Sequence, residues 1–277
     1  MSEQVLLAGC GDLGLRVARL LRQRGDVVYA LRRKPPASVA QDIEWLRADL
    51  TRPQSLRELP TGITQLVYLP TPDRRDPTAY RATFVDGLRH LLDALGPATL
   101  RRVLLVSSSA VYGEHHGDWV NEDTPVAPPG FNGATLLEAE QLLAAWPTRA
   151  IVLRLAGLYG PGRLQLLDRL RAGTAHAPRG RPHWANRIHV DDAAAAIAHL
   201  LQLADPLPCY LGVDSTPLPL DMLYDDLARL ICAAPPADGP PPTGIGSKRL
   251  SNARLLASGV APRWPDARAG YAALFDH

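Results

Sequence analysis

The sequence predicts an α/β fold of the Rossmann type, a doubly wound parallel sheet followed by a small C-terminal lobe. Three observations support this prediction. An apolar stretch, a glycine turn and an amphipathic run open the chain between residues 5 and 21. Short apolar runs then alternate with helical patterns as far as residue 155, which is typical of consecutive βαβ units. Beyond residue 155 this alternation loosens, and irregular and Pro-rich segments separate the helical patterns.

The first βαβ unit contains a G-x-G-x-x-G motif directly after an apolar strand. Glycine at these positions lets the strand turn sharply, lets a pyrophosphate approach the backbone, and lets the helix pack closely on the strand. Amide groups at the start of the helix then face the phosphate charge. We therefore predict a dinucleotide site here, the alternative being a glycine turn without a ligand. The expected contact residues are Gly9, Gly11, Asp12, Leu13 and Gly14.

The second strand is predicted at residues 27–31, and three basic residues follow it: Arg32, Arg33 and Lys34. An NAD-specific site usually carries an acid at this point, which bonds the ribose hydroxyls. Basic groups suit a 2′-phosphate instead. We therefore expect NADP to be preferred over NAD, with Arg32 and Arg33 in the site. The alternative interpretation is a solvated basic loop.

Two further strand ends are expected beside the cofactor, because loops at the carboxyl ends of parallel strands surround the ligand. The third strand is predicted at residues 43–46 and the fourth at residues 65–69. An acid after the third strand can reach an adenine amino group. The expected contacts are Asp49, Leu50, Leu69, Pro70 and Thr71. The amphipathic helix predicted at residues 76–95 is interpreted as core, with a face available for a dimer.

The sheet continues with strands predicted at residues 102–106 and 151–155, joined by a helix at residues 134–146. Residues 1–155 are thus expected to form the NAD(P)-binding region. Residues 156–277 are expected to form a substrate lobe interleaved with the last sheet elements, within one structural domain overall. The 277 residues contain 46% hydrophobic residues, enough for such a packed core.

Charge and cysteine content exclude several classes of protein. The net charge is +2 without a long single-sign run, which argues against a nucleic-acid binder driven by charge. Three unclustered cysteines suggest a reduced cytoplasmic protein without a disulfide framework or a metal site. No signal peptide is evident at the start, and no apolar run reaches the roughly 18 residues of a membrane span.

The ordered motifs of the chain resemble those of the extended short-chain dehydrogenases/reductases, the NAD-dependent epimerase/dehydratase group. The segment from Arg154 to Arg163 resembles the corresponding segment in the YeeZ-like branch of atypical members. The resemblance implies a Rossmann fold, an NAD(P) cofactor and a small-molecule substrate. It rests on the glycine motif, Ala48-Asp49-Leu50, residues 107–113, Arg154 with residues 158–162, residues 188–192 and Ser247-Lys248-Arg249.

The resemblance also implies a catalytic Tyr-x-x-x-Lys pair, which this chain lacks. Aligning Glu140 with the family's usual Ala-Glu places Asn132 at the Tyr position and Leu136 at the Lys position. Shifting the alignment by one residue gives Phe131 and Thr135, and neither pair can transfer a proton. The only lysines are Lys34 and Lys248, and the residues four positions earlier are Ala30 and Gly244.

Three residues are candidates for the remaining chemistry. Ser108 matches the family's catalytic Ser or Thr, and Ser109 follows it. Tyr159, in the loop that borders the substrate in relatives, is the best substitute acid. The alternatives are a Ser that caps backbone groups and a packed aromatic ring.

Two functions therefore remain open. The first is an atypical NAD(P)-dependent oxidoreductase or epimerase acting on a polar, sugar-like substrate. The second is a non-catalytic NAD(P)-binding regulator or scaffold. A homodimer through the helices at residues 76–95 and 134–146 is what the resemblance implies.

Overall fold

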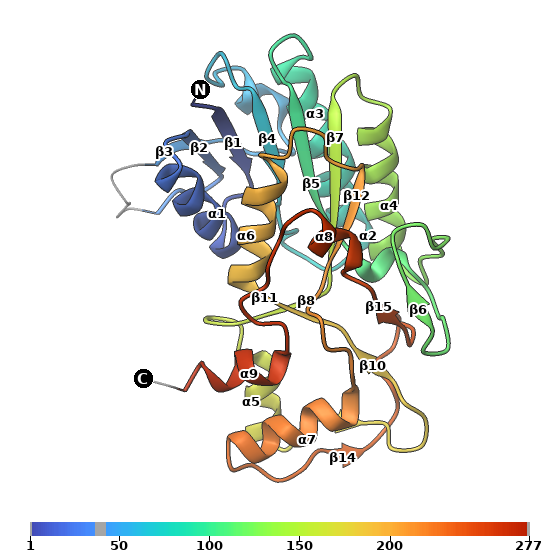
Figure 1. Ribbon diagram of the computed structural model, residues 1–277. Helices are drawn as coiled ribbons and strands as arrows, with labels where there is room; N and C mark the ends of the chain where they lie inside the picture. Colours follow the sequence, from blue (N-terminus) through green and yellow to red (C-terminus); the bar gives the residue numbers. More distant parts are fainter. Residues whose placement is uncertain (1, 37–42, 276–277) are drawn as a thin grey trace.

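The computed structural model describes residues 2–36 and 43–275 and confirms the doubly wound parallel sheet (Figure 1). Seven strands lie in the order β12-β7-β5-β4-β1-β2-β3, and each neighbouring pair is parallel. Their carboxyl ends point toward the lobe. The strands are β1 (Gln4–Ala8), β2 (Val27–Arg32), β3 (Glu44–Arg47), β4 (Gln65–Tyr68), β5 (Arg102–Ser108), β7 (Arg149–Leu155) and β12 (Cys209–Gly212).

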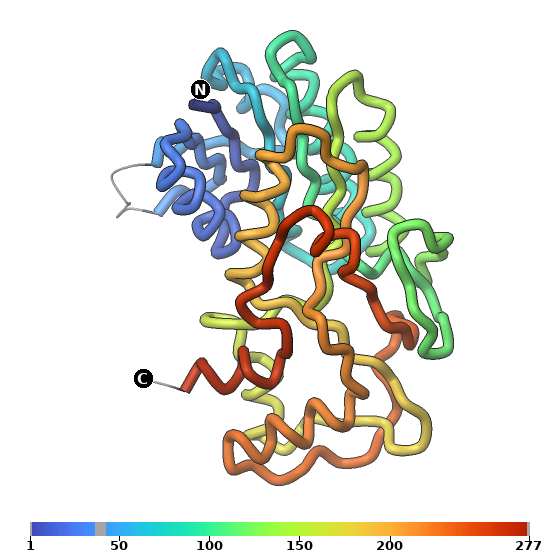
Figure 2. The backbone as a smooth tube through the Cα atoms, in the orientation of Figure 1, coloured from blue at the N-terminus to red at the C-terminus, as the bar shows by residue number. Residues whose placement is uncertain are grey.

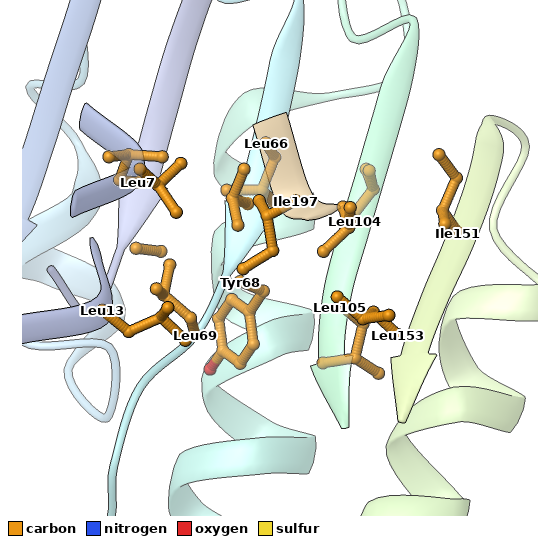
Figure 3. Packing of buried hydrophobic residues seen from close by; sticks show 14 of the residues in the cluster. Leu7, Leu13, Leu66, Tyr68, Leu69, Leu104, Leu105, Ile151, Leu153 and Ile197 are labelled. Atoms are coloured by element: carbon orange, nitrogen blue, oxygen red, sulfur yellow. The ribbon is translucent and has the colours of Figure 1, made fainter. Parts of the chain in front are cut away.

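Helices cover both faces of this sheet (Figure 1). One face carries α1 (Asp12–Gln23) and α6 (Val190–Leu200), which pack against each other. The other face carries α2 (Pro77–Arg81), a π-helical turn (Ala82–Asp86), α3 (Gly87–Leu95) and α4 (Phe131–Ala144). Coverage on both sides explains why the central strands are nearly continuous apolar runs. Figure 3 shows their side chains packed together, with those of Leu7, Leu66, Leu104 and Ile151 in a row and Ile197 of α6 beside them.

The remaining elements form a lobe below the carboxyl ends of the strands. Its core is a second cluster of buried residues built around α5 (Gln165–Arg171), α7 (Leu220–Leu230) and α9 (Ala267–Ala272). Figure 2 shows the chain leaving the lobe to form α6 and β12 on the sheet and then returning to α7. The two cores are therefore built from interleaved segments.

Short strand pairs and a few single turns complete the two cores. The pairs are β8 (Gly157–Tyr159) with β11 (Arg187–His189), β9 (His176–Ala177) with β14 (Ala237–Asp238), β10 (Trp184–Ala185) with β13 (Leu218–Pro219), and β6 (Trp119–Val120) with β15 (Arg249–Leu250). The turns are 3-10 helical at Pro53–Leu56 and Ser109–Val111, and α8 (Ala253–Ala257) lies beside β12. None of the helices in residues 2–36 and 43–275 is long and apolar enough to cross a membrane.

Two predicted helices differ from the observed ones, for physical reasons that the sequence does not display. The helix at 76–95 contains the π-helical turn Ala82–Asp86, and at Gly87, which follows it, a Cβ would lie 2.8 Å from the Tyr68 hydroxyl. The helix predicted at 134–146 begins at Phe131 and ends at Ala144. Its Gly133 is needed inside the helix, because a Cβ there would lie 2.2 Å from the Ala110 carbonyl oxygen.

Candidate functional site

The glycine turn between β1 and α1 forms the centre of the candidate site. Gly9 has a φ of +90°, which favours glycine, and a Cβ there would lie 2.3 Å from the Cα of Pro70. The loop after β4 therefore crosses directly over the turn. At Gly14 a Cβ would lie 3.0 Å from the Cys10 sulfur, so α1 packs close to β1. These are two of the three roles that the motif predicts for its glycines.

The N-terminus of α1 is open to a ligand. Gly11 is its N-cap residue, and no side-chain hydrogen bond caps this helix end. A Cβ at Gly11 would find only the Gly9 carbonyl oxygen, 4.0 Å away, so it would project into open space. The first-turn amides are thus free to bind an anion, and the absent side chain leaves room for it.

Two cavities meet at this turn. The central cleft, with a volume of about 390 Å³, runs from the glycine turn to the carboxyl ends of β5 and β7. The lateral cavity, of about 540 Å³, lies at the ends of β2 and β3. Both are lined by Gly9, Gly11, Pro70 and Thr71. The two cavities therefore adjoin each other at the glycine turn, one on either side of the same four residues.

All twelve residues that the sequence predicts as cofactor contacts line one cavity or both. Four of them line only the central cleft: Asp12, Leu13, Gly14 and Leu69. Another four line only the lateral cavity: Arg32, Arg33, Asp49 and Leu50. Local motifs thus predicted residues that the fold brings together from four strand ends.

Ion pairs shape the lateral cavity. Arg33 forms a two-pronged pair with Asp73, and this hydrogen bonding holds the pKa of Asp73 below its usual range. Arg32 is exposed at the end of β2. The Asp49 carboxylate accepts hydrogen bonds from the amide and hydroxyl of Thr51, at 3.0 and 2.8 Å, so its position is fixed.

The far end of the central cleft lacks a proton-transfer pair. Asn132 and Leu136 both line it, which is where the alignment on Glu140 places the family's Tyr and Lys. Ser108 lines it as well, and its Oγ accepts a hydrogen bond from the Ala110 amide at 3.2 Å. That bond leaves the Ser108 hydroxyl proton free for donation. Ser109 begins the next turn and is not among the lining residues.

Tyr159 does not reach this cleft, and the expectation of a substitute acid there is not supported. Its side chain belongs to the core of the lobe, 1% exposed, with its ring stacked on Tyr271 at 4.3 Å between centroids. Burial raises the pKa of its phenol, and the hydroxyl has no hydrogen-bond partner. A packed aromatic ring, the alternative interpretation, describes Tyr159 better.

The structure places two further side chains in the cleft, those of Tyr80 and Arg163. Tyr80 of α2 lines the cleft, with its ring edge-on to Phe131 at 5.2 Å. The helical spacing of apolar residues over 76–95 predicts a core residue at this position. Arg163 enters from the loop after β8. The sequence makes Arg163, Arg179, Arg181 and Arg187 equal candidates to bind a phosphate or carboxylate, the alternative being solvated side chains, and of these four only Arg163 lines the cleft.

A buried ionic network supports the floor of the cleft. Glu140 of α4 pairs with Arg154 of β7, with 2.6 Å between Oε2 and Nη2. Ser107 donates to Glu140 at 2.5 Å, and Arg154 donates to the Tyr112 hydroxyl at 2.7 Å. The network ties α4 to the ends of β5 and β7, beside Ser108 and Asn132. In the described residues, no group of three or more His, Cys, Asp or Glu could hold a metal ion.

Two solved structures share this architecture. A protein of Methylobacillus flagellatus, provisionally assigned as an NAD-dependent epimerase/dehydratase, is 41% identical, with a TM-score of 0.83 over 99% of this chain and 98% of its own. The UDP-glucose 4-epimerase of Thermus thermophilus, solved with NAD, is 20% identical, with a TM-score of 0.82 over 97% of this chain and 96% of its own. At that identity the second likeness shows the fold alone.

Two curated proteins are similar in sequence. Protein YeeZ of Escherichia coli K12 is 34% identical over 154 residues, 55% of this chain and 54% of YeeZ, so the alignment spans about half the length of that relative. A 3-diazoavenalumate denitrifying reductase of Streptomyces is 28% identical over 253 residues, 84% of this chain and 83% of its own. The family model for the NAD dependent epimerase/dehydratase family matches residues 5–209. The chain therefore belongs to the NAD dependent epimerase/dehydratase family.

Proposed function

We propose that this protein is an NAD(P)H-dependent oxidoreductase that acts on a polar, sugar-like substrate in the central cleft. The observation that carries the proposal is that the two cavities adjoin at the glycine turn and share its residues Gly9 and Gly11 as lining. An adenosine in the lateral cavity and a nicotinamide beside Ser108 would occupy both. The open space at Gly11 supports this assignment, since any side chain there would fill the pyrophosphate position.

The chemistry divides between the cofactor and the chain. When bound, the nicotinamide supplies or accepts the hydride. The Ser108 hydroxyl and the Asn132 amide both line the cleft and can donate hydrogen bonds to a substrate oxygen. Such donors stabilise the negative charge that develops on a carbonyl oxygen during reduction. Tyr80 carries the one phenol among the described lining residues and is the nearest equivalent of the family's proton donor.

NADP is the cofactor that we propose, because Arg32 and Arg33 line the lateral cavity. Guanidinium groups bind phosphate with two parallel hydrogen bonds. Arg33 already holds Asp73, so Arg32 is the group most readily available to a 2′-phosphate.

The test is NADPH oxidation measured across a panel of nucleotide sugars and keto acids. We expect turnover that falls at least tenfold in Ser108→Ala, the loss typical of one hydrogen bond in a transition state. Ser109→Ala is the matched control, because Ser109 does not line the cleft. Equal rates in both variants would contradict the role of Ser108.

A non-catalytic NAD(P)-binding regulator is the second candidate, favoured by Asn132 and Leu136 at the positions of the missing pair. It predicts tight cofactor binding without turnover on any member of the panel. It also predicts that a partner protein is retained in pull-downs by the cofactor-bound form. Turnover that depends on Ser108 would exclude it.

A further inference from the structure

A chain of four charges begins in the central cleft, which two of its members, Asp12 and Arg163, line. Asp12 stands in the first turn of α1 and lies 3.2 Å from the Arg16 Nε and 3.4 Å from the Arg163 Nε. Arg16 also pairs with Asp191 at the start of α6. These contacts join the cofactor-binding helix to the β8–α5 loop of the lobe.

The contact between Arg163 and Asp12 is electrostatic rather than a full hydrogen bond. The Arg163 Nε is buried and has no hydrogen-bond partner in the structure. The rest of the side chain is 30% exposed and lines the central cleft. Its backbone is held by a tight turn, in which the Arg163 amide donates to the Gly160 carbonyl at 3.0 Å. A fixed backbone thus presents a guanidinium with unused donors to the cleft.

Asp12 gives such a cation a role, because Arg16 divides its charge between Asp12 and Asp191. A pyrophosphate bound at the amides of Asp12 and Leu13 would place its negative charges beside the Asp12 carboxylate. That carboxylate is half-exposed and lines the same cleft. Like charges at this separation repel, and a shared cation removes the repulsion.

We propose that Arg163 is a cofactor-binding residue that the lobe supplies, donating hydrogen bonds to the pyrophosphate of the dinucleotide while it neutralises Asp12. The inference rests on the proposed cofactor site. It also implies that a bound cofactor strengthens the contact between the β8–α5 loop and α1 that Arg163 and Asp12 already make.

The test is a set of equilibrium titrations with NADPH, NADH, ADP-ribose and adenosine 2′-monophosphate. We expect Arg163→Gln to raise the Kd about ten- to hundredfold for the three pyrophosphate ligands, the effect of one charged hydrogen bond. Adenosine 2′-monophosphate should bind unchanged, since it has no pyrophosphate. Arg163→Lys should keep part of the affinity, and Arg171→Gln, on the exposed side of α5, is the matched control.

A double-mutant cycle with Asp12→Asn makes the test more specific. That variant removes the repulsion, so Arg163→Gln should cost less in the Asp12→Asn background than in the wild type. Unchanged dinucleotide affinity in Arg163→Gln, or an equal loss for adenosine 2′-monophosphate, would overturn the inference. Failure of the wild-type protein to bind any dinucleotide would instead refute the proposed function.

Discussion

Gly9 and Gly11 lie two residues apart, and alanine at the two positions should have opposite effects. At Gly9 the alanine would be forced into a positive φ, which costs about 1–2 kcal/mol. Its Cβ would also overlap the Pro70 backbone at 2.3 Å, which adds about 1–3 kcal/mol of overpacking strain. We therefore expect Gly9→Ala to lower the free energy of unfolding by roughly 2–5 kcal/mol.

Gly11→Ala should leave stability nearly unchanged and affect binding instead. The backbone there is extended, with φ of −90°, and the added Cβ meets no atom closer than 4.0 Å. Losing glycine as the N-cap lowers the free energy of unfolding by about 0.5–1 kcal/mol. The lower conformational entropy of the unfolded alanine chain offsets a similar amount. The methyl group would stand where the pyrophosphate must approach, so the Kd for NADPH should rise at least tenfold.

Urea unfolding and NADPH titration of both variants, measured side by side, test the two predictions. A Gly11→Ala protein that binds NADPH like the wild type would refute the cofactor site. A Gly9→Ala protein as stable as the wild type would refute the steric account of the turn.

Three other predictions follow from the charged groups of the structure. Arg32→Ala should raise the Kd for NADPH about tenfold and leave that for NADH unchanged; equal changes for both would contradict the 2′-phosphate assignment. Glu140→Gln should cost about 3–5 kcal/mol in urea unfolding, because it leaves the buried Arg154 charge uncompensated. The exposed pair of Glu138 on the same helix is the control, and Glu138→Gln should cost at most about 1 kcal/mol. Burial raises the pKa of Asp214 to about 8, with the nearby Asp266 charge adding to it, so the folded state favours the neutral acid. The contribution of this group to the free energy of unfolding is therefore fully present below about pH 4 and is lost as the pH rises toward 8. Asp214→Asn should gain stability over the wild type from pH 5 to pH 8, and parallel pH profiles for the two proteins would contradict this.

The residues that line the two cavities around the glycine turn could be predicted because their causes are local. The glycine turn requires small residues at fixed spacing, and the strand ends that follow carry their polar residues within two or three positions. Each of these contacts is specified by a short segment, and the parallel sheet then brings the segments to one edge. The prediction of Asp49, for example, needed only the end of one strand.

The substrate half depends on contacts between distant segments, which spacing does not reveal. Tyr159 is withdrawn from the cleft because Tyr271, more than a hundred positions later, stacks on its ring. Arg163 is placed in the cleft because the lobe folds over α1. Tyr80 shows the helical spacing of a core residue, yet its side chain is half-buried and lines the cleft.

A crystal structure of the protein with NADPH tests the central claim most directly. The account predicts the pyrophosphate at the first-turn amides of α1, residues 12–14, the adenosine in the lateral cavity, and the nicotinamide within hydrogen-bond reach of Ser108 or Asn132. A cofactor bound elsewhere, or a nicotinamide directed away from those two side chains, would contradict it.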